Sequence, residues 1–405
     1  MDFSLTTEER ALLETARAVG PAFAERAQRY DDASAFPEEN FRELRAAGLL
    51  ALTVPKAYGG HGLWQGQNYL GYYLVIEELS RHCSSTAQLL QVHCHAIGYL
   101  ALHASKAQKD HYLPMVARDG TLFASCGSEA SVKQVGPEPF DATLRRTKEG
   151  WRLKGYKGFA SLSAAADYYV CWALAEGTKR MADGMMFAIV PKSAPGVRLE
   201  NDWDVMGMRP TVSWGIHLDD VPLSDLEVAG VPGCWVQGDP RTFTLAFAAN
   251  HLGTAQGVYD FTLGFVRERP FLRDSPLIQV KLGELEAMLR STRALIYHAA
   301  WQWEQGDADE AERASMCALH AGKQTSLEIT TRAFDLCGAR AAYRLYPLER
   351  AFRDVRTFTL HFREERILQM VAQASLGLPF HSKLRYGPKL KPEEMVKPAF
   401  AMGAE

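Results

Sequence analysis

The 405-residue chain lacks several features that would assign it to a class of protein at once. Its seven cysteines include no Cys-x-x-Cys pair, which argues against zinc and iron–sulfur sites and is typical of a reduced compartment. It has no run of about 18 apolar residues, and its first residues show no cationic segment followed by an apolar one, so we expect neither a membrane-spanning helix nor a signal peptide. A formal net charge of −3 excludes a broad basic surface for nucleic acid or anionic lipid. A cytoplasmic protein is therefore expected.

The composition that is present is that of an ordinary globular protein, with 47% hydrophobic and 23% charged residues. The chain is too long for one small core and suits two or three packed modules. Apolar residues recur at helical spacing, then in short strand-like runs, and then again at helical spacing. We predict an α+β, mostly α fold, with an N-terminal helical domain (1–120), a middle antiparallel β domain (121–232), a C-terminal four-helix bundle (233–385) and a tail (386–405).

Local signals place some of the helices. Thr6 or Thr7, followed by a glutamate, predicts a capping box at the start of the first helix. The C-terminal bundle is predicted to use helices over 240–269, 276–305, 308–340 and 359–376.

Four motifs, in this order, resemble those of the acyl-CoA dehydrogenase superfamily. They read "LRAAGLLALTVPKAYGG", "GWRLKGYKGFASLSAAADYYVCWA", "DVMGMRPTVSWGIHLDDVPL" and "YPLERAFRDVR". The resemblance covers nearly the whole chain. It implies the fold of that superfamily, a flavin (FAD or FMN) between the β domain and the bundle, and a homotetramer or homodimer.

The resemblance also implies cofactor contacts in the β domain. Ser128 matches a position whose hydroxyl contacts the flavin pyrimidine, Phe159 one that covers the isoalloxazine, and Ser161 one whose hydroxyl reaches flavin N5. A flavin needs an apolar wall on its face and a few placed hydrogen bonds at its edge, which these residue types supply. Without the resemblance, Phe159 would be read as a core residue and Ser161 as a turn hydroxyl.

Two departures from the dehydrogenase pattern concern the catalytic base. Where most dehydrogenases of the superfamily carry the glutamate that removes the substrate α-proton, this chain has Phe362, directly after His361. A minority place the base on an earlier helix, where this chain has Phe243. Because α-proton abstraction needs a carboxylate within hydrogen-bond reach, dehydrogenation would require a relocated base such as Glu364 or Glu365. Otherwise these two residues are expected to form the solvated first turn of the last helix.

A third departure concerns the turn that seats the FAD pyrophosphate of a neighbouring subunit in the dehydrogenases. Here it reads "FDLCGARAAYR", with Cys337 and Arg340 in place of glycines. The change is compatible with FMN, or with FAD held by arginines such as Arg267, Arg269 and Arg340.

Three short motifs resemble the two-component flavin-dependent monooxygenases of this fold, the branch that includes dibenzothiophene monooxygenase. "LLQVH" ends at His93, "GYKGFAS" ends at Ser161 and "RTFTLH" ends at His361, which fills the three catalytic positions of that branch. An imidazole titrates near neutral pH, so His361 or His93 could donate a proton to a flavin peroxide. His93 and His95 lie on different faces of a helix, so no metal site is expected.

The substrate pocket is expected to include Phe362, Phe243, Asn250 and His251. The leading hypothesis is a monooxygenase that takes reduced flavin from a separate flavin reductase and activates O2, through a C4a-hydroperoxide, on a small-molecule substrate. The first alternative is an acyl-CoA or carrier-bound acyl dehydrogenase with a relocated base. The second alternative is a non-catalytic scaffold.

Overall fold

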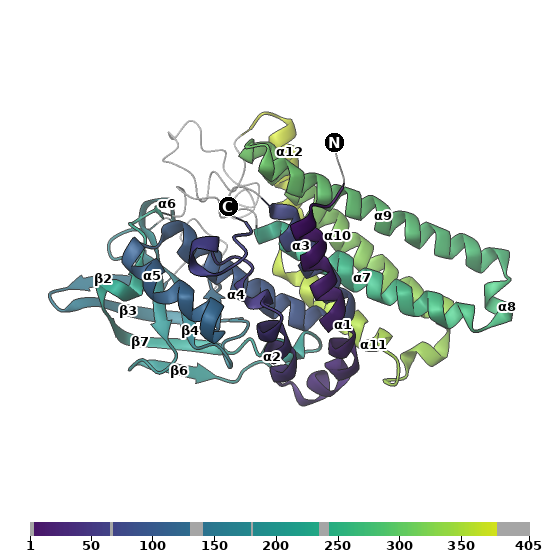
Figure 1. The fold of residues 1–405 in the computed structure, drawn as a ribbon, viewed down its shortest axis with the longest axis horizontal. Helices are drawn as coiled ribbons and strands as arrows, with labels where there is room; N and C mark the ends of the chain where they lie inside the picture. Colours follow the sequence, from purple (N-terminus) through teal and green to yellow (C-terminus); the bar gives the residue numbers. More distant parts are fainter. Residues whose placement is uncertain (1–3, 65–67, 130–140, 180, 235–242, 379–405) are drawn as a thin grey trace, which may run out of the picture.

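The computed structural model describes residues 4–64, 68–129, 141–179, 181–234 and 243–378. Helices, a sheet and a second set of helices follow one another along the chain, and Figure 1 shows the sheet at one end of the molecule and long C-terminal helices at the other. The predicted α+β, mostly α fold class is therefore confirmed. The predicted tail, residues 386–405, lies outside the described residues.

The N-terminal part consists of helices that stand between the sheet and the C-terminal helices (Figure 1). They are α1 (Thr7–Ala33), α2 (Glu38–Ala46), α3 (Tyr69–His82), α4 (Ser84–His103) and α5 (Lys106–Pro114). The capping box uses Thr6: its Oγ1 accepts from the Glu9 N–H at 3.2 Å, and the Glu9 carboxylate accepts from the Thr6 N–H at 2.7 Å. Although α3 and α4 are almost entirely buried, no helix of the described residues has the length and hydropathy needed to cross a membrane.

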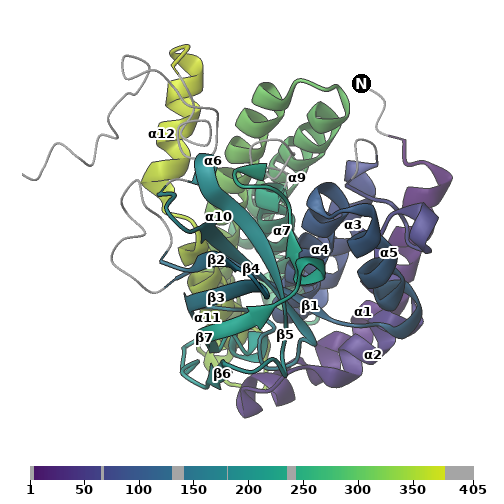
Figure 2. The ribbon, with the colours of Figure 1, turned by 90° about the vertical axis from the view of Figure 1, so that its left-hand side faces the viewer.

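The β domain is built on one eight-stranded sheet of described residues. Its strands are β1 (Phe123–Cys126), β2 (Thr143–Thr147), β3 (Gly150–Lys157), β4 (Tyr168–Ala175), β5 (Met185–Pro191), β6 (Val197–Glu200), β7 (Gly215–Leu223) and β8 (Val228–Ala229), with the short helix α6 (Met181–Gly184) before β5. The order is β6-β7-β3-β2-β4-β5-β8, with β1 beside β4, and Figure 2 shows the strands from the sheet end of the molecule. The sheet is mixed rather than antiparallel throughout, because β1 and β2 run parallel to β4 and share one of its edges. Alternation of apolar and polar residues predicts which face of a strand is buried, but it does not predict whether the neighbouring strand runs parallel or antiparallel.

The C-terminal part contains α7 (Phe243–Arg267), α8 (Pro270–Arg273), α9 (Pro276–Glu304), α10 (Ala308–Cys337), α11 (Leu348–Phe358) and α12 (Glu364–Ser375). The helix predicted over 359–376 is wrong at its start. A 3-10 turn spans Thr359–His361, Phe362 is extended with φ −125° and ψ 133°, and α12 begins only at Glu364. This break places His361 and Phe362 in a turn between two helices.

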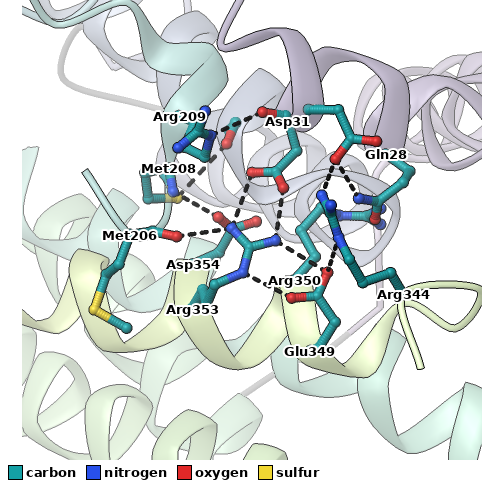
Figure 3. A network of polar contacts seen from close by, with 12 residues as sticks. Gln28, Asp31, Met206, Met208, Arg209, Arg344, Glu349, Arg350, Arg353 and Asp354 are labelled. Atoms are coloured by element: carbon teal, nitrogen blue, oxygen red, sulfur yellow. Dashed lines mark hydrogen bonds and ion pairs between the residues drawn. The ribbon is translucent and has the colours of Figure 1, made fainter. Parts of the chain in front are cut away.

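A polar network joins the three parts of the molecule at α11 (Figure 3). The Arg353 guanidinium donates to the Asp31 carboxylate of α1 at 2.6 Å and to the Met206 carbonyl oxygen of the β domain at 2.7 Å. The next residue, Asp354, accepts a hydrogen bond from the Met208 N–H at 2.5 Å. The "RDVR" motif therefore holds the loop after β6 against the N-terminal and C-terminal helices.

Candidate functional site

The turn after β3 carries two of the residues expected to face a flavin. Phe159 has a left-handed backbone with φ +52° and leaves 64% of its surface exposed. This backbone is costly for a bulky residue, and such strain is often found at ligand sites. Ser161 is 7% exposed, and Ser128 is brought alongside because its carbonyl oxygen accepts from the Gly158 N–H at 3.1 Å. The structure thus brings Ser128, Phe159 and Ser161 together.

A buried ion pair lies directly behind this turn. Lys157 Nζ lies 2.7 Å from Glu129 Oε1, and both side chains are almost completely buried. The Glu129 carboxylate also accepts from the N–H groups of Asp141 and Ala142, at 2.6 Å and 3.1 Å. A buried pair is tolerated better when its remaining hydrogen-bonding sites are satisfied, and these two N–H groups satisfy those of the Glu129 carboxylate. The pair fastens the segment of Ser128 to the end of β3.

The Ser161 hydroxyl faces a second loop, the one that precedes β7. Its Oγ lies 2.8 Å from Ser213 Oγ, and the Leu162 N–H donates to the Thr211 carbonyl oxygen at 2.9 Å. Four of the eight non-glycine residues with positive φ in the described part of the chain lie in these two loops: Phe159, Leu162, Met208 and Val212. Backbone strain is therefore concentrated around Ser161.

His361 lies among aromatic rings at the turn between α11 and α12. Its ring centroid is 5.0 Å from that of Phe358 and 5.1 Å from that of Phe247 on α7. The Nδ1 atom lies 3.2 Å from the Phe358 carbonyl oxygen, which can only accept, so Nδ1 carries the hydrogen and Nε2 is an acceptor. The ring keeps solvent access, yet burial by the surrounding protein lowers the pKa of His361. Since a neutral ring with this tautomer accepts a proton at Nε2, the expectation that His361 donates a proton is not supported.

The position that the resemblance gives to the dehydrogenase base holds Phe362, and the next acidic residue, Glu364, is engaged elsewhere. Phe362 packs edge-on against Phe247 with ring centroids 5.1 Å apart, and its carbonyl oxygen accepts from Lys323 Nζ at 2.8 Å. Lys323 Nζ also lies 2.6 Å from Glu364 Oε2, and His320 Nδ1 bonds to the same carboxylate. Burial would raise the pKa of Glu364, but hydrogen bonds from Lys323 and His320 outweigh it and lower that pKa.

Glu364 is therefore a half-buried member of an ion-pair cluster that holds the turn, and the expectation that it is solvated is wrong. This engagement does not favour Glu364 as a relocated base. Glu365, the next residue, is exposed as expected.

His93 is placed differently from its expected catalytic role. The ring is fully buried, Nδ1 accepts from the Phe123 N–H at 3.1 Å, and Nε2 lies 3.1 Å from the Leu50 carbonyl oxygen. Burial lowers the pKa of His93 to about 4. Both ring nitrogens are thus used to hold backbone, which leaves no atom for substrate. On α4 it is His95 whose ring faces Phe247, at 6.4 Å between centroids.

The expected pocket residues of α7 also have structural partners. Asn250 is fully buried; its Oδ1 accepts from Ser84 Oγ at 2.8 Å and its Nδ2 donates to the Ser84 carbonyl oxygen at 3.1 Å. The expectation that Asn250 contacts substrate is therefore not supported. His251 is 4.7 Å from Phe358 between ring centroids, and its Nδ1 lies 2.9 Å from Ser326 Oγ. The side chain of Phe243 lies outside the described part of the chain.

Of the arginines expected at the pyrophosphate, Arg269 directly precedes α8, which Figure 1 shows at the end of the molecule away from the sheet. Arg269 packs over the Phe265 ring at 3.5 Å and donates to the Phe265 carbonyl oxygen at 2.7 Å, while Arg267 and Arg340 are exposed. The structure does not bring them to Ser161 within one chain. Their role toward the FAD of a neighbouring subunit, in a homotetramer or homodimer, stays a prediction.

Some residues of the site were missed in the sequence. Lys157 follows Leu153 at an even spacing in β3, so strand alternation alone predicts that it points inward. Ser213 and Thr211 belong to the segment "RPTVSWG", but nothing in its letters shows that their hydroxyls meet Ser161. Within the described residues, no group of three or more His, Cys, Asp or Glu side chains could hold a metal ion.

Family models match this chain in three consecutive segments. The acyl-CoA dehydrogenase N-terminal domain matches residues 6–119, the middle domain 133–221 and the C-terminal domain 245–365. The chain belongs to the acyl-CoA dehydrogenase family.

This chain is similar both to monooxygenases and to acyl-CoA dehydrogenases. The "Probable FMNH2-dependent monooxygenase SfnC" of Pseudomonas putida is 27% identical over 385 residues, covering 89% of this chain and 93% of the relative. The short-chain-specific acyl-CoA dehydrogenase of Clostridium acetobutylicum is 25% identical over 390 residues, covering 93% and 100%. The crystal structure of dibenzothiophene monooxygenase (TdsC) from Paenibacillus sp. A11-2 matches with a TM-score of 0.81 and 25% identity, covering 92% and 98%. The expected likeness to both branches is confirmed.

Proposed function

We propose that this protein is a flavin-dependent monooxygenase that receives reduced flavin from a separate reductase and oxygenates a small molecule. The observation that carries the proposal is which residues occupy the turn between α11 and α12 and what they bind. The base position holds Phe362, and Glu364 is bound by Lys323 and His320. Burial lowers the pKa of His361, and the bond that opposes this effect comes from the Phe358 carbonyl oxygen rather than from a carboxylate. An α-proton would thus find no carboxylate at the position of Phe362, and the nearest one, that of Glu364, is already bound.

The residues present fit a flavin. The exposed Phe159 ring offers an apolar face, and Ser161 and Ser128, two residues with hydroxyl groups, belong to the same turn and to the segment bonded to it. A flavin site requires this combination of a wall for the ring and a few placed polar groups. The strained backbone of Phe159 supports the assignment, because strain without a ligand role would lower stability to no benefit.

When bound, a reduced flavin supplies two electrons, so that one oxygen atom of O2 enters the substrate and the other leaves as water. The chain's own residues then hold protons and exclude water. His361 Nε2 can accept a proton, and the rings of Phe247, Phe358 and Phe362 around it are apolar. Apolar rings of this kind help to exclude water once a ligand is bound, and exclusion of water favours oxygen transfer over release of peroxide.

The test compares the two chemistries on one preparation. Chemically reduced FMN or FAD and 18O2 are supplied with indole, dibenzothiophene or methanesulfinate, chosen because structures of relatives are named for them. We expect 18O in the product, and no anaerobic bleaching of protein-bound oxidised flavin by butyryl-CoA. Bleaching without 18O incorporation would make the protein a dehydrogenase instead. Failure to bind any flavin would favour a scaffold.

A further inference from the structure

Three hydroxyl groups and one carbonyl group are linked by consecutive hydrogen bonds next to the proposed flavin site. We refer to them as the hydroxyl chain. Ser161 Oγ lies 2.8 Å from Ser213 Oγ, which lies 2.7 Å from Thr211 Oγ1. Thr211 Oγ1 in turn lies 2.7 Å from the Met208 carbonyl oxygen. All three hydroxyl side chains are buried, so bulk water competes little for these bonds.

The carbonyl oxygen at the end of the hydroxyl chain determines which hydroxyl group donates in each hydrogen bond. A carbonyl oxygen can only accept, so Thr211 donates its single hydroxyl hydrogen to Met208. Ser213 must then donate to Thr211, and Ser161 must donate to Ser213. The hydroxyl hydrogen of Ser161 therefore points into the protein, and only lone pairs of its oxygen remain for a ligand.

The loop that carries the carbonyl group is held firmly in place. The Met208 N–H donates to Asp354, and Trp203 Nε1 donates to the Met208 carbonyl oxygen at 3.2 Å. Reversal of the chain would remove the Thr211 hydrogen bond from this carbonyl oxygen with no new partner inside the protein. The direction inferred here is thus the one that makes the most hydrogen bonds among these buried groups.

We infer that Ser213 and Thr211 are positioning residues that keep the Ser161 hydroxyl as a hydrogen-bond acceptor, so that the site prefers reduced to oxidised flavin. The inference rests on the proposed function, and on the family resemblance by which the Ser161 hydroxyl would reach flavin N5. In reduced flavin N5 carries a hydrogen and donates it, whereas in oxidised flavin N5 is a bare acceptor. His361, with Nδ1 bonded to Phe358, presents a second acceptor. Such a site takes up reduced flavin and releases the oxidised form after turnover.

The experiment measures the dissociation constants of oxidised FMN and of dithionite-reduced FMN, both without oxygen, for each variant. Wild type is expected to bind the reduced form more tightly. Ser213→Ala frees Ser161 to donate outward and should lower this preference by roughly fivefold to tenfold, about the effect of one hydrogen bond. Thr211→Val removes the hydroxyl that links Ser213 to the Met208 carbonyl oxygen and should also lower the preference for reduced FMN. Ser163→Ala is the control for the loop itself. Its hydroxyl bonds to the carbonyl oxygens of Val212 and Trp214, on either side of Ser213, but to none of the three hydroxyl groups, so the preference should not change.

The outcomes are distinct. If wild type and both chain variants show the same preference, the inference is overturned while flavin binding and oxygenation still support the proposed function. If Ser213→Ala fails to fold, Thr211→Val decides. If wild type binds neither form of FMN or FAD, the proposed function fails and the inference fails with it.

Discussion

The Nδ1 atom of His361 lies 3.2 Å from the carbonyl oxygen of Phe358, three residues before it in the chain. This bond fixes the imidazole as the tautomer whose Nε2 accepts. The Ser161 hydroxyl, at the end of its own chain of hydrogen bonds, is likewise an acceptor. Two separate parts of the fold therefore offer acceptors, and a ligand with N–H donors suits both.

We expect oxygenation to depend on His361 in its neutral form. Burial lowers the pKa of His361, so a role as acceptor is present above that lowered pKa and is lost only as the pH falls through it. The yield of oxygenated product should be flat between about pH 6.5 and 8, and His361→Ala should reduce it by roughly a hundredfold. His217→Ala, which changes a histidine bonded to Glu200 on β7, should leave it unchanged. A yield that falls as the pH rises through this range would show that the protonated ring is needed.

Glu364→Gln should weaken the fold rather than remove a catalytic base. The substitution leaves the buried Lys323 ammonium without its carboxylate, so the free energy of unfolding should fall by about 2–4 kcal/mol. The exposed neighbour provides the control, since Glu365→Gln should change the free energy of unfolding by less than about 0.5 kcal/mol. Urea denaturation measures both. Loss of α-proton exchange on an acyl-CoA thioester, with stability intact, would instead identify Glu364 as the base.

Asp354 should make stability depend on pH. Burial raises the pKa of Asp354 from 3.8 to about 6, so its folded form binds a proton more readily than its unfolded form. This contribution is fully present below about pH 4 and is lost as the pH rises through 6, which amounts to about 3 kcal/mol. Asp354→Asn can still accept from the Met208 N–H but does not ionise. As the pH rises from 4 to 7, the free energy of unfolding of the variant should increase by about that much relative to wild type, as measured by denaturation at each pH. Parallel curves for the two proteins would contradict the prediction.

The order of helices, sheet and helices could be predicted because hydrophobic periodicity is local. The mixed sheet and the break at Phe362 could not, since they depend on the direction of β4 and on Lys323, which lies 39 residues away in sequence. The same limit applies to the site. Motifs predicted Phe159, His361 and His93 as site residues and the pocket prediction added Asn250, but the polar atoms of His93 and Asn250 are bonded within the protein. Only coordinates show which polar atoms are already bonded.

Phe159→Gly should separate ligand binding from stability. Glycine adopts the left-handed backbone without strain, and the Phe159 ring is mostly exposed, so the free energy of unfolding should stay the same or rise by up to about 1 kcal/mol. The affinity for FMN or FAD should fall, because the apolar wall is lost. Phe159→Tyr keeps the ring and should keep the affinity. Titration of flavin fluorescence and thermal unfolding check the two effects. A clear loss of stability with unchanged affinity would make Phe159 a core residue, and the flavin face would have to lie elsewhere.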